Sequence, residues 1–294
     1  MRLILTLLVR DEVDVVAATI EHHLAAGVDY VIATDNGSVD GTADVLAAYR
    51  DAGVLELHTV NEDNYAQGVW VTRMARRAAE VHGADWVINA DADEFWWPRD
   101  GECLATVMKI LPPRYATISA ARENLVAAPG DDGPWPRRLV LRDLLSLHER
   151  GGRIGSKVCH RASPDVVVDM GNHRVVHEEP GEQWPGSPIT VLHVPDRSYR
   201  QFANKIRVGG ASLANNPTLS LDSGWHWRED YERLRNGTLH QAWKARQLTP
   251  RQMTNGLASG RLVHDDRLAR RLFDLRARAV RPDLLQAVFS GSRP

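Results

Sequence analysis

Apolar runs and amphipathic segments alternate along the first hundred residues of the chain. Each run is short and nearly continuous, as expected for a strand that a sheet buries on both faces. The segments between the runs repeat apolar residues at helical spacing, as in 11–27 and about 67–82. Such strand–helix–strand units predict a Rossmann-like, mostly parallel sheet with right-handed crossovers. The predicted strands are residues 3–9, 30–34, 54–60 and 84–90.

The pattern changes after about residue 100. Short apolar segments are separated there by loops rich in proline and glycine, which predict shorter strands. Helical spacing returns at 198–214, and the chain from about 225 onward is mostly helical. We therefore expect an α/β fold with a helical C-terminal extension.

Composition narrows the class of protein. The 294 residues are 43% hydrophobic, enough to fill a sizeable core, and the formal net charge is −2. A nucleic-acid-binding protein would carry a clustered basic excess, so no nucleic-acid partner is expected. No segment approaches the roughly 20 apolar residues of a membrane-spanning helix. We expect a cytoplasmic protein, and the basic amphipathic segment 268–280 leaves peripheral membrane contact open.

Three carboxylates stand close together in INADADEFWWP, residues 88–98. Asp91, Asp93 and Glu94 directly follow the fourth strand, at the sheet edge where α/β proteins bind ligands. Alternation along a continuing strand would point Asp91 and Asp93 the same way and Glu94 toward the other face. Two such carboxylates suit Mg²⁺ or Mn²⁺, which prefer oxygen ligands. A solvated acidic turn is the alternative, but the bulky FWWP segment favours a lined pocket.

The loop after the first strand argues against several other phosphate-handling enzymes. It reads LVRDEVD, residues 8–14, and lacks the G-x-G-x-x-G motif of dinucleotide dehydrogenases. The chain also lacks a P-loop sequence. Sugar nucleotidyltransferases place a glycine-rich loop at the same position, so they are disfavoured as well. A phosphatase with a D-x-D nucleophile would carry it after the first strand, not the fourth.

Several separated segments together resemble one family, the family 2 glycosyltransferases. They are LVRDEVDVVAATIEHHLAAGVDYVIATDNGSVDGT, WVINADADEFWWP, and residues 156–175 and 192–206. These enzymes have the nucleotide-diphospho-sugar transferase (GT-A) fold, and the most similar group extends D-x-D to DADEF. The resemblance implies a GT-A domain at 1–215 followed by a helical extension at 216–294. Within that domain, 1–100 would bind the nucleotide, and 101–215 the acceptor and metal.

The resemblance implies nucleotide-binding roles for four residues. Asp35 would hydrogen-bond the base, expected to be uracil, and Asp11 lies in the segment 8–12 that forms the rest of that pocket. Arg73 occupies the usual place of a basic residue near the nucleotide. Asp91 would meet the ribose or the metal.

The same resemblance implies a site for a metal and a diphosphate. Asp93 would bind Mn²⁺ or Mg²⁺ directly, with Asp91 and the late histidine His193 as further ligands. Arg197 and Lys205 follow on a helix that could face the diphosphate, where cations stabilise leaving-group charge. Two alternatives stay open here: His193 as a buried histidine bonded to backbone, and the two cations as surface residues.

Inversion at the anomeric carbon, which the resemblance also implies, needs a general base near the acceptor hydroxyl. Family members often carry an acidic pair for this purpose, and this chain has no matching Glu-Asp pair. The segment VVVDMGNHRVVHEEP (166–180) offers Asp169, His173 and Glu178 instead. His173 is the first choice, because a Gly-Asn turn before it can present a side chain to a cleft. A turn-stabilising or metal-binding role is the alternative for this histidine.

The sequence thus predicts a metal-dependent glycosyltransferase that moves a sugar from a UDP-sugar to a hydroxyl acceptor. The acceptor would be a glycan, a lipid-linked molecule or a small molecule. Two other functions stay open: a sugar nucleotidyltransferase, and a non-catalytic protein that binds a nucleotide-sugar.

Overall fold

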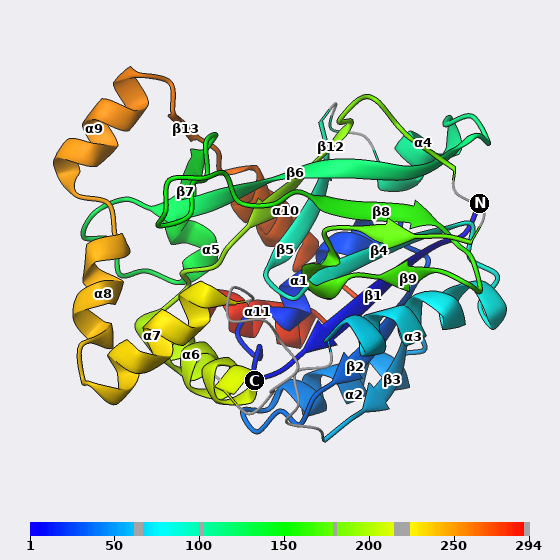
Figure 1. Cartoon of the computed structure of the whole chain (residues 1–294), viewed down its shortest axis with the longest axis horizontal. Coiled ribbons are helices and arrows are strands. Elements are labelled where there is room, and N and C mark those ends of the chain that lie inside the picture. The colour runs from blue at the N-terminus through cyan, green and yellow to red at the C-terminus, as the bar shows by residue number, and fades with distance from the viewer. Residues whose placement is uncertain (62–66, 100, 102, 179–180, 215–223, 291–294) are drawn as a thin grey trace.

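The computed structural model describes residues 1–61, 67–99, 101, 103–178, 181–214 and 224–290. Its N-terminal half is a parallel sheet in the order β3-β2-β1-β4, as the apolar runs predicted. Helices α1, α2 and α3 connect these strands (Figure 1). The bounds are β1 (Leu3–Val9), α1 (Val16–Ala25), β2 (Tyr30–Asp35), α2 (Thr42–Asp51), β3 (Leu55–Thr59), α3 (Gln67–Glu80) and β4 (Trp86–Asp91).

Beyond β4 the sheet becomes mostly antiparallel. Strand β8 (Lys157–Arg161) pairs antiparallel with both β4 and β6 (Tyr115–Ala127). The order then continues through β7 (Leu139–Asp143) to β13 (Leu262–His264). Strand β12 (Ile189–His193) runs parallel to β6 and antiparallel to β5 (Glu94–Pro98), so His193 lies opposite both Glu94 and Asn124. This pairing brings the late histidine back to the acidic segment.

The C-terminal region is continuous with this core. Its strand β13 pairs with β7, and α10 and α11 pack against α1. The carboxylate of Glu21 on α1 accepts hydrogen bonds from the backbone N–H groups of Val280 and Arg281, just before α11. The remaining elements are α4 (Leu104–Lys109), α5 (Trp135–Arg138), β9 (Val167–Val168), η1 (Met170–Asn172), β10 (Val175–Val176), β11 (Glu182–Gln183), α6 (Tyr199–Ala214), α7 (Trp225–Arg235), α8 (Leu239–Arg246), α9 (Pro250–Ala258), α10 (Arg267–Leu275) and α11 (Pro282–Ser290).

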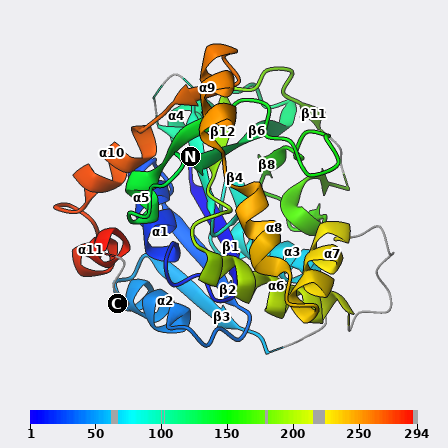
Figure 2. The same ribbon diagram turned by 90° about the vertical axis from the view of Figure 1, so that its left-hand side faces the viewer.

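Apolar side chains fill both faces of the parallel half. Alternate residues of β1 divide between the two faces, with Leu3, Leu5 and Leu7 in the larger core cluster and Ile4 in the smaller one. Figure 2 shows α1, α10 and α11 on one side of the sheet and α3 on the other. The predicted α/β class and helical C-terminal region are confirmed. None of the described helices is long and apolar enough to cross a bilayer.

Candidate active site

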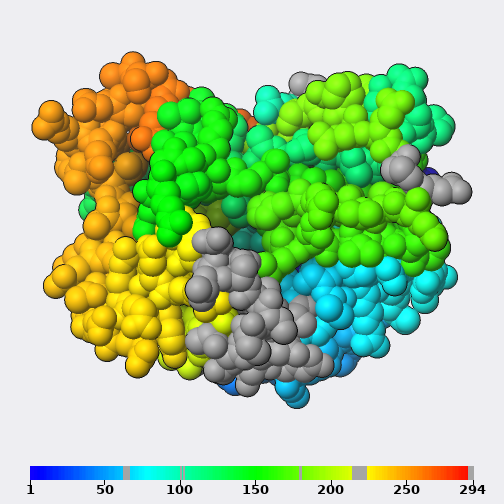
Figure 3. Space-filling model, in the orientation of Figure 1, coloured from blue at the N-terminus to red at the C-terminus, as the bar shows by residue number. Residues whose placement is uncertain are grey.

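A cavity of about 1070 Å³ lies at the carboxyl ends of β1 and β4. Its walls come from both halves of the chain: the loop after β1, the turn after β4, the loop between β7 and β8, and helices α6 and α7. Figure 3 shows a hollow on this face, between the green segment around residue 150 and yellow α7. Asp91, Asp93, His173, His193 and Lys205 all line this cavity.

The three crowded carboxylates do not alternate as a continuing strand would. Strand β4 ends at Asp91, a turn follows, and β5 begins at Glu94. As a result Asp91 and Glu94 share one partner, the ammonium group of Lys157, at 2.7 and 2.9 Å. Asp93 has a different partner: its Oδ2 accepts a hydrogen bond from the ammonium group of Lys205 at 2.8 Å. The predicted pairing of Asp91 with Asp93 on one face, with Glu94 opposite, is therefore wrong.

Protein cations compensate much of the crowded negative charge. Burial alone would raise the pKa of Asp91, yet Lys157 lowers it below its ordinary value. Burial likewise opposes ionisation of Asp93, but Lys205, His193 and Arg197 hold its pKa well below the usual range. Burial raises the pKa of Glu94 to about 7 in spite of Lys157. Lysine and arginine side chains therefore provide much of the positive charge that allows these carboxylates to lie close together.

Asp93 and His193 lie close together in the cavity wall. Nδ1 of His193 lies 2.7 Å from the side-chain oxygen Oδ1 of Asn124, so Nδ1 donates. Burial lowers the pKa of His193 to about 4, so the ring is neutral and Nε2 carries a lone pair. Nε2 lies 3.6 Å from Oδ1 of Asp93. A carboxylate oxygen and an imidazole nitrogen at this separation suit a bound divalent cation.

The distances also fit a divalent ion. Metal bonds of about 2.1 Å to each atom are long enough to join an oxygen and a nitrogen 3.6 Å apart. The second oxygen of Asp93 is occupied by Lys205, with Arg197 at 3.7 Å. Among the residues that the structure describes, no group of three or more His, Cys, Asp or Glu side chains converges on one point. Substrate oxygens and water would complete the coordination, as is usual for Mg²⁺ on phosphates.

Arg197 and Lys205, the two cations that the sequence prediction placed near the diphosphate, both pair with acidic side chains around Asp93. Arg197 is buried and pairs with Glu12, with Asp14 at 2.8 Å and with Asp93. Lys205 lies 3.6 Å from Glu12 in addition to its bond with Asp93. Burial raises the pKa of Glu12 to about 7, although both cations oppose this. Arg197 thus acts as a buried counter-ion, and Lys205 is the more accessible of the two at the cavity wall.

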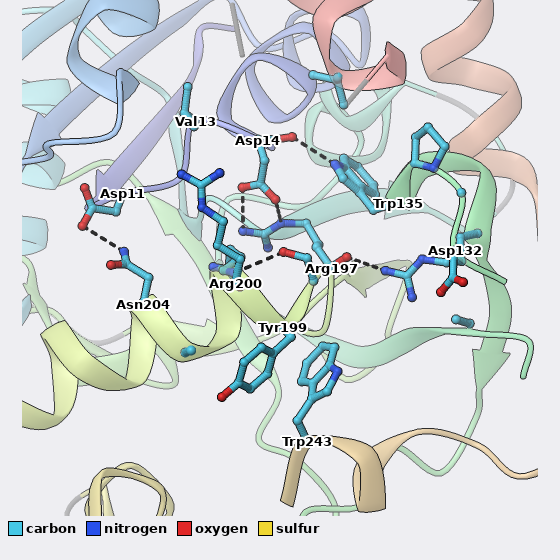
Figure 4. Close-up of a pocket in the computed structure, with 18 of the residues that line it drawn as sticks. Asp11, Val13, Asp14, Asp132, Trp135, Arg197, Tyr199, Arg200, Asn204 and Trp243 are labelled. Carbon is cyan, nitrogen blue, oxygen red and sulfur yellow. Dashed lines mark hydrogen bonds and ion pairs between the residues drawn. The ribbon is translucent and has the colours of Figure 1, made fainter. Parts of the chain in front are cut away.

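Asp35 and Asp11 lie beside the cavity rather than in its wall. Asp35 is buried at the end of β2, where its Oδ2 accepts from the backbone N–H of Ser38 at 3.2 Å. Its Oδ1 is buried without a hydrogen-bond partner among the described residues. Asp11 faces a second cavity of about 1320 Å³, where it accepts from Asn204 at 3.0 Å. Figure 4 shows this contact beside the pair of Arg197 with Asp14.

Three further residues of the sequence prediction line neither of these two cavities. Arg73 is exposed on α3, in a groove that α3 forms with residues 167–170. Asp169 lines the same groove and pairs with exposed Arg174 at 2.6 Å. Glu178 is exposed, and its backbone N–H donates to Asp165. The structure does not bring these three side chains to the acidic cluster.

His173 is the one proposed base that reaches the cavity. Its ring lies between two glycines: a Cβ added at Gly155 or Gly171 would approach ring atoms to 2.9 or 2.7 Å. Nδ1 lies 2.7 Å from the carbonyl oxygen of Ser156, so Nδ1 carries the hydrogen. Burial lowers the pKa of His173, which favours the neutral ring. The neutral ring then holds its free lone pair on Nε2, as a general base requires.

The motifs and this geometry together point to one enzyme class. The model of glycosyltransferase family 92 matches residues 6–244, which is most of the chain. The chain belongs to glycosyltransferase family 92. The predicted glycosyltransferase class is thus confirmed, and the family that matches is family 92 rather than family 2. No curated protein matches the chain.

Solved structures give a weak likeness. S. aureus TarS (residues 1–349) aligns over 99% of this chain and 91% of its own, at 12% identity and a TM-score of 0.42. Its complex with UDP-GlcNAc aligns over 99% and 93%, at 11% identity and a TM-score of 0.41. Glucosyl-3-phosphoglycerate synthase from Mycobacterium tuberculosis, with Mn²⁺, UDP and glucosyl-3-phosphoglycerate, aligns over 41% and 44%, at 16% identity and 0.31. Likeness at this level carries no conclusion about what the family 92 chain binds.

The sequence prediction missed three residues that shape the site of this family 92 chain. Lys157 is buried at the start of β8 and binds Asp91 and Glu94. Asn124 on β6 fixes the ring of His193. Arg122, on the same strand, lies 3.4 Å from Glu94. One signal in the sequence could have indicated Lys157: it directly precedes the apolar pair Val158–Cys159. A lysine at such a position either ends a strand or is buried in a pair with acidic side chains.

Proposed function

We propose that this chain is a metal-dependent transferase of GT-A type, which moves a sugar from a UDP-sugar to a hydroxyl group. One observation carries the proposal: Oδ1 of Asp93 and Nε2 of His193 lie 3.6 Å apart in the cavity wall. Mn²⁺ or Mg²⁺ bound there would withdraw charge from the diphosphate of the donor. Asp93 and His193 would hold the ion, and Lys205 would face the same phosphates.

Uracil suits the environment of Asp35. The buried Oδ1 of this carboxylate has no partner among the described residues, and the ring N3–H of uracil is a donor that would satisfy it. Asp91, held by Lys157, is then placed to accept from the ribose hydroxyls. Arg10 and Asn36, which follow β1 and β2, also line the cavity between these positions.

In the proposed transfer His173 takes the proton of the acceptor hydroxyl at Nε2. The acceptor oxygen attacks the anomeric carbon as the bond from that carbon to the diphosphate oxygen breaks. The electron pair stays on the diphosphate, where Lys205 stabilises it. Attack from the side opposite the diphosphate inverts the anomeric centre, in agreement with the resemblance to inverting transferases.

Thermal unfolding with nucleotides tests the binding part of this proposal. UDP with Mn²⁺ should stabilise the protein by about 2.7 kcal/mol at a hundredfold excess over Kd. The effect should fall on chelation and in Asp93→Asn, whereas Asp44→Asn, at an exposed carboxylate on α2, serves as the matched control. A shift that ignores both chelator and Asp93→Asn would refute the metal site. No shift with any nucleotide would refute the donor site.

A product assay separates the transferase from its two alternatives. Release of UDP from a UDP-sugar, measured with and without hydroxyl acceptors, is the expected activity. Pyrophosphate released from UTP and a sugar phosphate would identify a nucleotidyltransferase instead. Binding of UDP-sugars without any release of UDP would identify a non-catalytic binding protein.

A further inference from the structure

We propose that Gly155–Ser156–Lys157, at the start of β8, is a positioning element that fixes the His173 imidazole relative to Asp91. This inference rests on the proposed function, because it assigns the element to the site of transfer. The three residues act through different atoms: Gly155 through its missing side chain, Ser156 through its carbonyl group, and Lys157 through its ammonium group.

The contacts of Lys157 join three separate segments of the chain. Its Nζ donates to Asp91 at 2.7 Å, lies 2.9 Å from Glu94, and donates to the carbonyl oxygen of Gly171 at 2.8 Å. The ammonium group thus makes two hydrogen bonds and one further ion pair. The end of β4, the start of β5 and the η1 turn are therefore held by one buried side chain, which has 1% of its surface exposed.

The neighbouring residues hold the imidazole of His173 from both sides. Ser156 accepts from Nδ1 at 2.7 Å, which fixes the tautomer and the tilt of the ring. Gly155 leaves room for the ring, because a Cβ there would lie 2.9 Å from Cε1 and Nδ1. Gly171, whose carbonyl oxygen accepts from Lys157, leaves room along another edge of the ring, because a Cβ added there would lie 2.7 Å from Cδ2. Moving any of these groups would move the ring relative to Asp91.

Gly155→Ala is the sharpest perturbation of this element. The φ angle of Gly155 lies outside the left-handed region, and the three atoms nearest to an added Cβ all belong to the His173 ring. A general base contributes about 10²- to 10⁴-fold, and a shift of about 1 Å can cost 10²-fold. UDP release from UDP-glucose and UDP-GlcNAc should therefore fall by about 10²-fold in Gly155→Ala. UDP binding, read by thermal shift, should stay at the wild-type level.

A double-mutant cycle with His173→Gln distinguishes a role of Gly155 in positioning the imidazole from a general loss of structure. If Gly155 acts through the imidazole, adding Gly155→Ala to His173→Gln should lower turnover no further. Full additivity of the two losses, or wild-type turnover in Gly155→Ala, would overturn the proposal. Gly186→Ala is the control, because the atoms nearest to its Cβ would be those of the Trp184 ring, which does not line the cavity.

A second measurement needs no activity. Nitrogen-15 spectra of histidine side chains distinguish Nδ1–H from Nε2–H tautomers, and His173→Gln assigns the signal. His173 should show the Nδ1–H tautomer in the wild type and lose its fixed state in Gly155→Ala and Lys157→Met. An unchanged signal in folded Gly155→Ala would overturn the inference. A wild type that binds no UDP, but shows the expected tautomer, would refute the proposed function and leave this element standing.

Discussion

Replacing Glu94 by glutamine should change how the stability of the protein depends on pH. Burial raises the pKa of Glu94 from 4.5 to about 7, although Lys157 and Arg122 oppose the change. The side chain has 0% of its surface exposed, so its ionised form loses hydration that the two cations do not fully replace. At a pH between these two pKa values, Glu94 is protonated in the folded protein and ionised in the unfolded chain.

The magnitude follows from the two pKa values. Each pKa unit corresponds to about 1.4 kcal/mol, so the difference between 4.5 and about 7 amounts to about 3 kcal/mol. This stabilisation is fully present below pH 4.5 and is lost as the pH rises through about 7. Glu94→Gln lacks the titrating group. Its free energy of unfolding, relative to the wild type, should therefore rise by about 3 kcal/mol between pH 4.5 and about pH 8.

Urea unfolding at several pH values measures this difference directly. The wild type and Glu94→Gln are compared at about pH 5, 6, 7 and 8, with the same buffer ions and ionic strength. Ser187→Ala, which removes no titrating group, should run parallel to the wild type. If the unfolding free energy of Glu94→Gln also changes with pH in parallel with the wild type, then burial does not raise the pKa of Glu94 as the structure indicates, and the reasoning is refuted.

Three further predictions test the site and its support. Asn124→Ala should weaken Mn²⁺ binding about 10- to 100-fold in a titration, because the ring of His193 loses the acceptor that fixes it; unchanged affinity would remove His193 from the metal site. Arg73→Ala should leave UDP binding unchanged in thermal-shift assays, since Arg73 is exposed outside the cavity; a clear loss would restore it to the nucleotide site. Glu21→Ala should cost about 3 kcal/mol in urea unfolding, because three hydrogen bonds to a buried carboxylate are lost; a cost under about 1 kcal/mol would contradict this anchor for α11.

The parallel half of the fold could be predicted because its strands are buried on both faces. Continuous apolar runs such as 3–9 need no distant partner to be recognised. Strand β8 could not be recognised in the same way. Its sequence KVCHR places lysine, histidine and arginine in a five-residue strand, of which Lys157 and His160 are buried. Only the fold shows that Asp91 and Glu94 neutralise the lysine.

Two expectations for the site differ from the structure for specific physical reasons. The prediction for Asp91, Asp93 and Glu94 assumed that the strand continues, whereas a turn after Asp91 reverses the chain into β5. Arg73 was placed by family resemblance alone. The spacing of the buried residues Trp70, Val71, Met74, Ala75 and Ala78 already turns position 73 toward solvent. Helical periodicity would have corrected the resemblance at this position.

The proposed base, His173, could be named from the sequence, but its position could not be predicted, because that position depends on two glycines. In a sequence, Gly155 and Gly171 indicate turns. In the fold they are the two surfaces between which the imidazole of His173 fits. That use depends on the approach of Gly155 to His173, 18 positions away, which no local pattern encodes. The same holds for Lys157, whose three acceptors lie 14 to 66 residues away. In this site, therefore, the sequence indicates the chemistry, and contacts between distant strand ends and turns determine its geometry.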